Sequence, residues 1–192
     1  MTVNCISAFP SPILQFGVAG FADQRDQIIK SIYSIKETTE SVSYSNEGGW
    51  QSPKQDPTPH ILFKTVNSIM TQFLNEELQY SIGNVWFNVN SEGSFNHKHT
   101  HPCCDLAAVF YVNVPEGDCG RLEIENPNYF NQVKLLDAMK PDIKESMVAF
   151  TSMWLNPVEG CGFIFPSHLV HRVSKNNTKE DRISISWNMT VN

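Results

Sequence analysis

The sequence predicts a mainly β fold preceded by helices. From position 81 to 192, short runs rich in β-branched and aromatic residues alternate with turn residues. Positions 1–80 instead show apolar residues at three- and four-residue spacing, the period of an amphipathic helix. Seven or eight strands within about 110 residues are typical of a sandwich, a jelly roll or a small barrel. We expect a single domain over 1–192, with a helical N-terminal part (1–80) and a β core (81–192).

Two helices are expected in the N-terminal part. The first begins after Asp23, which stands where an N-cap would, and a second apolar stripe runs from Leu62 to Leu74. The stripe of the first helix consists of Ile28, Ile29, Ile32 and Ile35. The segment 41–60 between the helices is rich in Gly, Pro, Ser and Asn, so we expect a long loop. Loops of this length inside a domain are usually functional or disordered.

The β core follows from period-2 runs. The expected strands lie in IGNVWFNVN, AAVFYVNV, RLEIE, MVAFTSMW, GFIFP, VHRVS and RISISWNMTV. The segment 126–146 interrupts them with helical character near KLLDAMK. We interpret it as an excursion over one mouth of the β core.

Composition limits the functional classes. The net charge of −6 and pI near 5.5 lack the basic footprint of a nucleic-acid binder. Hydrophobic residues make up 41% of the chain, which excludes wholesale disorder, and no apolar run approaches the roughly 20 residues that cross a bilayer. The N-terminal segment has no secretory pattern, and the five cysteines show no zinc-ribbon spacing. We expect a soluble, cytoplasmic protein with free thiols that acts without nucleic acid or membrane.

Histidines form the first candidate site. In GSFNHKHTHP, His97, His99 and His101 alternate with other residues, so an extended segment would place them on one face. Two such imidazoles make a two-point metal clamp, and His171, far downstream in FPSHLVH, offers a third ligand. Nitrogen-rich ligation suits iron, zinc, copper or nickel. The alternative is a solvated, His-rich turn.

The last expected strand has one polar and one apolar face. Alternation places its polar residues together: Arg182, Ser184, Ser186 and Asn188. An interior that binds a small dicarboxylate would use such a face, because Arg offers a bidentate fork to a carboxylate and Ser184 adds a hydroxyl. The alternative is the solvent-facing side of an edge strand.

These pieces resemble iron(II)- and 2-oxoglutarate-dependent oxygenases, and most closely the uncharacterised subfamily of marine bacteria and their phages, which is distantly similar to prolyl hydroxylases. The resemblance rests on FPSPI (9–13), GGWQS (48–52), NHKHTHP (96–102), the strand VFYVNVP, FPSHLVH and RISISWN. It implies a double-stranded β-helix (jelly roll) with Fe(II), and 2-oxoglutarate and dioxygen as co-substrates. The implied reaction hydroxylates an unidentified primary substrate and releases succinate and CO2.

The resemblance also implies residue roles. His99, His101 and His171 map onto the iron ligands, and Arg182 maps onto the residue that anchors the far carboxylate of 2-oxoglutarate, with Ser184 beside it. Asn88 and Tyr111 are further candidates for contact with the co-substrate.

Two positions depart from the family pattern. Most of the wider superfamily has Asp or Glu where this chain has His101, and Asp105 is the alternative third ligand if the chain bends. Phe110 stands where relatives often have the first of two tyrosines, and Tyr111 would point to the other face of a regular strand. His97, His60 and His168 are interpreted as non-ligands.

Two other functions stay open. One is a cupin-like dioxygenase with three-His metal and no 2-oxoglutarate, which would leave Arg182 and Ser184 unexplained. The other is a non-enzymatic jelly-roll module that binds metal. Whichever function holds, the oligomeric state stays open, with a homodimer as one option.

Overall fold

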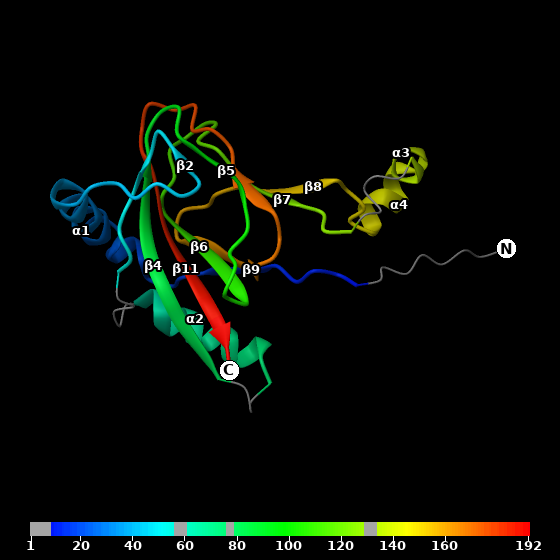
Figure 1. Cartoon of the computed structure of the whole chain (residues 1–192), viewed down its shortest axis with the longest axis horizontal. Coiled ribbons are helices and arrows are strands. Elements are labelled where there is room, and N and C mark those ends of the chain that lie inside the picture. The colour runs from blue at the N-terminus through cyan, green and yellow to red at the C-terminus, as the bar shows by residue number, and fades with distance from the viewer. Residues whose placement is uncertain (1–8, 56–60, 76–78, 129–133) are drawn as a thin grey trace.

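Two antiparallel β-sheets face each other and form the body of the protein (Figure 1). The computed structural model describes residues 9–55, 61–75, 79–128 and 134–192. In order across the major sheet, the strands are β1 (Leu14–Gly17), β9 (Cys161–Pro166), β6 (Leu106–Asn113), β11 (Arg182–Val191), β4 (Tyr80–Asn90) and β3 (Trp50–Gln51). Across the minor sheet they are β2 (Asn46–Glu47), β5 (Phe95–His99), β10 (His171–Val173), β7 (Leu122–Glu125) and β8 (Ser152–Leu155).

Strands distant in sequence are neighbours in both sheets, as in a jelly roll. β11 lies between β4 and β6, and β10 lies between β5 and β7. The mainly β fold with N-terminal helices is thereby confirmed, and each of the seven expected runs contains a strand. The N-terminal part is less purely helical than expected, because β1, β2 and β3 all join the sheets.

Two longer helices cover the outer face of the major sheet (Figure 1). They are α1 (Arg25–Thr38) and α2 (Ile61–Phe73), close to the expected stripes. The expected N-cap at Asp23 is wrong: Asp23 ends a short 3-10 helix (Phe21–Asp23), and Gln24 occupies the cap position without a side-chain hydrogen bond. Within the described residues, no helix is long and apolar enough to cross a membrane.

The segment 126–146 does not cover a mouth of the β core, as far as it is described. Its helices are α3 (Leu135–Ala138) and α4 (Pro141–Ser146), which lie beyond the outer ends of β7 and β8 (Figure 1). None of its described residues lines the cavity between the sheets. The expectation of a cover was therefore wrong for this part of the chain.

The segment 41–60 is more ordered than a loop in its described part. β2 pairs with β5 of the minor sheet, and β3 pairs with β4 of the major sheet, so this segment bridges both sheets. Trp50 is buried, and its indole Nε1–H donates a hydrogen bond to the Thr39 carbonyl (3.3 Å). His60 lies outside the described residues.

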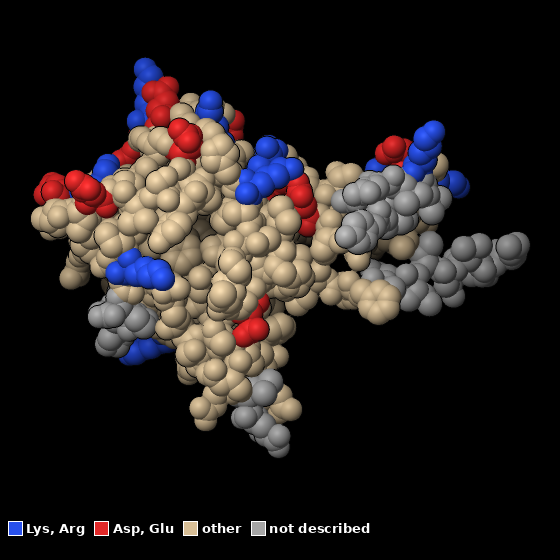
Figure 2. Space-filling view, in the orientation of Figure 1, with Lys and Arg blue, Asp and Glu red and all other residues tan. Residues whose placement is uncertain are grey.

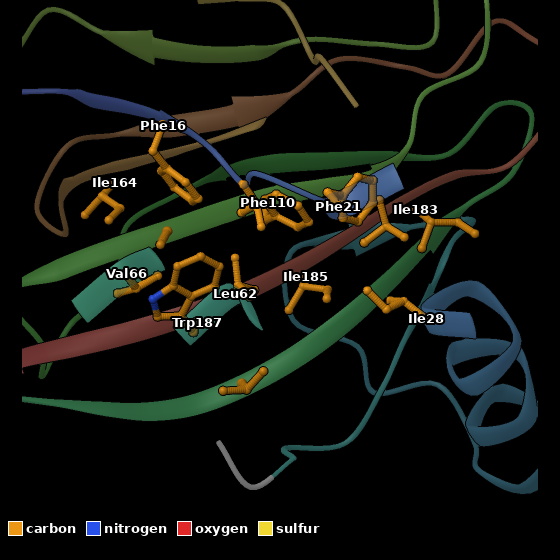
Figure 3. Close-up of a cluster of buried hydrophobic side chains, with 14 of the residues drawn as sticks. Phe16, Phe21, Ile28, Leu62, Val66, Phe110, Ile164, Ile183, Ile185 and Trp187 are labelled. Carbon is orange, nitrogen blue, oxygen red and sulfur yellow. The ribbon is translucent and has the colours of Figure 1, made fainter. Parts of the chain in front are cut away.

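Apolar packing occupies both faces of the major sheet. The larger core lies between this sheet and the two helices, where Trp187 and Phe110 contact Phe16 from β1 (Figure 3). A smaller core between the sheets contains Tyr111 and Phe163, whose rings meet edge to face. Fully burying a large apolar side chain contributes about 1.5–3 kcal/mol, so the larger core contributes most of the stabilisation.

The described cysteines are free thiols, in line with the expectation. They are Cys103, Cys104, Cys119 and Cys161. Cys5 lies outside the described residues.

Candidate functional site

A cavity of about 560 Å³ lies between the two sheets. The polar face of β11 forms part of its wall, since Arg182, Ser184, Ser186 and Asn188 all line it. The ends of β5 and β10 contribute histidines, and the segment 41–55 contributes residues at the mouth. Figure 2 shows a hollow in the face of the molecule between the strands of the two sheets. A volume of this size is typical of small-molecule sites.

Strand pairing brings three histidines together. His99 ends β5 and His171 begins β10, and these two residues are direct partners in the antiparallel register. His101 follows β5 and is held by its backbone N–H, which donates to the Ser167 carbonyl (3.0 Å). One ligand atom from each of the three side chains lies within 4.8 Å of the others. Among the described residues, no other group of three His, Cys, Asp or Glu residues meets this criterion.

Backbone carbonyls orient two of these rings. His99 Nδ1–H donates to the carbonyl of His97 (2.7 Å), and His171 Nδ1–H donates to the carbonyl of Leu169 (2.8 Å). Both rings therefore present an unprotonated Nε2. The Nε2 atoms of His101 and His171 lie 3.2 Å apart. The three rings thus bring one nitrogen each to a common point and form a candidate donor set for a metal ion, with the Ser45 hydroxyl 3.4 Å from His99 Nε2 as their neighbour.

Burial keeps the imidazoles neutral. Burial, followed by the charge of His99 and a smaller contribution from His101, lowers the pKa of His171 to about 3, against the opposing effect of the Leu169 carbonyl. Burial, followed by the charge of His99, lowers the pKa of His101 to about 4, and burial also lowers the pKa of His99. Trp86 stacks on the His101 ring, with centroids 5.7 Å apart, which adds to its shielding. At neutral pH no proton competes with a cation for these nitrogens.

A buried guanidinium occupies another part of the cavity wall. Arg182 begins β11, is only 2% exposed and donates from Nη1 to the Cys119 carbonyl (2.7 Å). In the described part of the chain no carboxylate forms an ion pair with it. Burial lowers its pKa, although an arginine stays charged. An uncompensated buried cation is costly, so this part of the cavity favours an anionic ligand.

Neutral polar side chains surround this guanidinium. Ser184 pairs in register with Tyr111 on β6 and Asn88 on β4, and all three line the cavity. Asn88 Nδ2 donates to Ser184 Oγ (3.4 Å) and Ser186 Oγ (3.2 Å). Burial raises the pKa of Tyr111 to about 12, so its phenol stays protonated. These groups offer hydrogen bonds to a carboxylate without adding charge.

The comparisons with known proteins agree with this geometry. Residues 84–188, more than half of the chain, match the family model described as "Putative 2OG-Fe(II) oxygenase". The chain belongs to the 2OG-Fe(II) oxygenase family. No curated protein matches the sequence.

Solved structures share the fold of this oxygenase at low sequence identity. A Pseudomonas putida prolyl-4-hydroxylase is 14% identical, with a TM-score of 0.63 over 94% of this chain and 92% of the other. The viral collagen prolyl hydroxylase of Paramecium bursaria Chlorella virus-1, solved with 2-oxoglutarate, is 13% identical (TM-score 0.58; 92% and 94% covered). HygX from Streptomyces hygroscopicus, solved with nickel and 2-oxoglutarate, is 12% identical (TM-score 0.59; 94% and 83% covered).

The oxygenase is an enzyme that uses Fe(II), 2-oxoglutarate and dioxygen, and it acts on a primary substrate. Its residues fit both Fe(II) and 2-oxoglutarate. Three neutral imidazoles converge on one point, as iron requires, and an unpaired buried guanidinium faces the same cavity, as a dicarboxylate requires.

Several residues singled out in the sequence lie elsewhere. His97 is exposed, with Nε2 3.6 Å from Glu47 Oε2, and His168 is exposed as well. The Asp105 carboxylate accepts a hydrogen bond from the Val191 backbone N–H (2.8 Å) and is absent from the histidine cluster. Phe110 lies in the larger core, which places Tyr111 on the cavity side of β6.

Other residues at the site had escaped the sequence analysis. Ser45 Oγ lies 3.4 Å from His99 Nε2, and Lys54 lines the cavity mouth. Both come from the segment 41–55, which reaches the site only because β2 and β3 join opposite sheets. No local period in the sequence marks such residues.

Proposed function

We propose that the oxygenase hydroxylates an organic substrate, with Fe(II) held by His99, His101 and His171 and 2-oxoglutarate anchored by Arg182. The observation that carries this proposal is the pairing, within one cavity, of a converging neutral histidine triad and a buried guanidinium without a protein counter-ion. A cupin-like enzyme without 2-oxoglutarate, or a structural metal module, would leave that guanidinium without a partner.

The histidines provide a rigid, neutral ligand set. The carbonyls of His97 and Leu169 fix two ring orientations, so the free nitrogens need little rearrangement on metal binding. Because the shell contains no carboxylate, the full charge of the metal remains to attract the co-substrate. Three imidazoles leave further coordination positions for exchangeable ligands.

The β11 wall binds and orients the co-substrate. Arg182 offers unused N–H donors for a charge-assisted bidentate contact with the far carboxylate of 2-oxoglutarate. Ser184, Asn88 and Tyr111 line the same wall and supply hydroxyl and amide groups that fix its orientation. When bound, Fe(II) and 2-oxoglutarate supply the oxidising chemistry, in which dioxygen is consumed, succinate and CO2 are released and the substrate gains a hydroxyl group.

The proposal is tested by metal content and co-substrate turnover. Wild-type protein should contain about one Fe(II) per chain by elemental analysis and release succinate only when 2-oxoglutarate is supplied. His171→Ala should lose both properties, because one of three ligands is removed. His97→Ala is the matched control and should keep both, since this exposed ring lies outside the triad. Stoichiometric iron in His171→Ala would refute the ligand assignment, and succinate-free wild-type turnover would favour the cupin-like alternative.

A second pair of variants separates His101 from Asp105 as the third ligand. His101→Ala should lose iron, whereas Asp105→Ala should keep it, because the Asp105 carboxylate is bound to the backbone of β11. The opposite result would mean that the segment after Thr100 rearranges and supplies a carboxylate to the metal.

We also propose that the enzyme is cytoplasmic and phage-like and forms one domain over 1–192. On this proposal it acts without nucleic acid or membrane. A homodimer is part of the same proposal. Sedimentation analysis of the purified protein tests the dimer.

A further inference from the structure

The charges that line the cavity are all of one sign. The chain as a whole is acidic, with 20 Asp and Glu against 14 Lys and Arg. Among the described residues that line the cavity, however, none is Asp or Glu, whereas Lys54, Lys98 and Arg182 all line it. In Figure 2, Lys or Arg side chains flank the hollow on two sides. Arg182 is the buried cation among these three, whereas Lys54 and Lys98 are exposed to solvent at the edge of the cavity, so an acidic protein presents only basic charges to this cavity within its described residues.

Acidic residues near the mouth are engaged outside the cavity. Lys98 pairs with Glu125, which does not line the cavity, and this pair is neutral. Glu47 faces the exposed His97 at 3.6 Å and does not line the cavity either. Lys54 differs from Lys98, because within the described residues it forms no ion pair or side-chain hydrogen bond. Lys54 is exposed to solvent at the edge of the cavity, and it has no counter-ion among the described residues.

2-Oxoglutarate does not account for all of this positive charge. Its two carboxylates oppose Arg182 and the metal, but three neutral imidazoles leave the charge of Fe(II) uncancelled. Arg182 and Fe(II) together carry three positive charges against the two negative charges of 2-oxoglutarate, and Lys54 adds a fourth. Inside the cavity the excess charge of Arg182 and Fe(II) attracts anions, and the solvent-exposed Lys54 adds to this attraction where the cavity meets solvent.

We infer that the primary substrate is a small organic anion, and that Lys54 binds its carboxylate or phosphate group. This inference rests on the proposed function, since it assumes metal at the triad and 2-oxoglutarate at Arg182. The cavity of about 560 Å³ is large enough to hold a small molecule beside the co-substrate. Lys54 is then a specificity residue that selects a charged substrate over its neutral analogue.

The test uses a matched pair of probes that differ only in charge, trifluoroacetate and trifluoroacetamide. Protein is loaded with Mn(II) and saturated with N-oxalylglycine, a non-reactive analogue of 2-oxoglutarate that blocks Arg182 and the metal. Mn(II) enhances the ¹⁹F relaxation of any probe that binds in the cavity. Trifluoroacetate should show saturable enhancement at millimolar concentration, and trifluoroacetamide should show about fivefold weaker binding, as expected for loss of a charge pair of about 1 kcal/mol.

Three variants assign the preference to Lys54. Lys54→Met should abolish the difference between the two probes, whereas Lys54→Arg should retain it. Lys64→Met, which removes an exposed lysine of α2 that does not line the cavity, should behave as wild type. Equal enhancement by both probes in wild type, or an unchanged preference in Lys54→Met, would overturn the inference.

The same samples distinguish this inference from the proposed function. Calorimetric titration of N-oxalylglycine reports the proposed function alone. If N-oxalylglycine binds normally but trifluoroacetate is not preferred over trifluoroacetamide, only the inference of an anionic substrate is overturned. Failure of Mn(II) or N-oxalylglycine to bind overturns the proposed function, and the inference that rests on it falls as well.

Discussion

The two faces of β11 show how one strand serves both stability and chemistry. Ile183, Ile185 and Trp187 pack into the larger core beneath the helices, whereas Arg182 and Ser184, on the opposite face, line the cavity. Both faces are buried, but only the apolar face stabilises the fold through burial alone. The polar face buries a charge and hydroxyls that are not needed for packing. Mutations on the apolar face should therefore reduce stability, and mutations on the polar face should reduce ligand binding.

The largest expected effect is on the apolar face. Trp187→Ala should lower the free energy of unfolding by about 3–5 kcal/mol, because it leaves a large cavity beside Phe16 and Phe63. Urea denaturation of the metal-free protein measures this. Trp187→Phe is the control and should cost much less, since it keeps an aromatic ring and removes a buried indole N–H that has no partner in the described structure. Equal losses in the two variants would show that ring packing is not the cause.

A glycine beside Arg182 should couple stability to binding. Gly120 has a φ of +88°, and a Cβ there would clash with the backbone carbonyl of Ser174 and lie 2.5 Å from Arg182 Nη1. Gly120→Ala should cost about 1–3 kcal/mol of stability through backbone strain and more through the clash with the Ser174 carbonyl, and it should also weaken N-oxalylglycine binding by displacing the guanidinium.

Gly93→Ala separates backbone strain from crowding of the Arg182 guanidinium. Gly93 has a similar φ of +85°, but a Cβ there meets nothing within 4 Å. This variant should lose stability without losing affinity for N-oxalylglycine. Comparable affinity losses in both variants would mean that crowding of Arg182 is unimportant.

The histidine cluster should make the metal-free protein sensitive to acid. The pKa values of His101 and His171 in the folded protein, about 4 and 3, lie below the value of about 6.5 in an unfolded chain. The unfolded chain therefore takes up protons first, and stability should fall as the pH decreases from about 6.5 towards 4. Urea midpoints measured in EDTA at pH 7 and pH 5 test this.

A variant without these two imidazoles provides the reference. The double variant His101→Leu, His171→Leu should show a flatter dependence between pH 7 and pH 5. An identical pH dependence in wild type and double variant would contradict the assignment of the effect to these residues.

The smallest expected effect is at Asn88. Asn88→Ala should weaken N-oxalylglycine binding only about 2- to 10-fold, the range of one neutral hydrogen bond of about 0.5–1.5 kcal/mol. Fluorescence or calorimetric titration measures the change. An effect as large as that of removing Arg182 would place Asn88 among the main anchors rather than beside them.

Sequence patterns were informative where one face of a strand is apolar. The alternation in RISISWNMTV predicted β11 residue for residue and separated Arg182 from Trp187. The prediction of β5 was conditional on an extended backbone, because FNHKH lacks apolar alternation. The segment becomes a strand through its pairing with β10 and β2. The two-residue strands β2 and β3 are too short to show a period.

The residues of the candidate site likewise divide into those that a local sequence pattern predicts and those that it does not. His99 and His101 share a short motif, so their juxtaposition was predictable from strand geometry, and His171 was already the candidate for a distant third ligand before the family resemblance supported it. The position of Lys54 depends on how the segment 41–55 crosses from one sheet to the other, which no local pattern encodes. The cap of α1 was misjudged because a 3-10 turn ending at Asp23 precedes the helix.

The central claim is that Arg182 is buried to bind a dicarboxylate and not to stabilise the fold. Calorimetric titration of N-oxalylglycine into Mn(II)-loaded wild type and Arg182→Met tests it most directly. Loss of a buried charge-assisted contact of about 2–5 kcal/mol should weaken binding roughly 30- to several-thousand-fold, with metal content and the urea midpoint nearly unchanged. Equal binding by the two proteins, or no binding to wild type at millimolar ligand, would contradict the account.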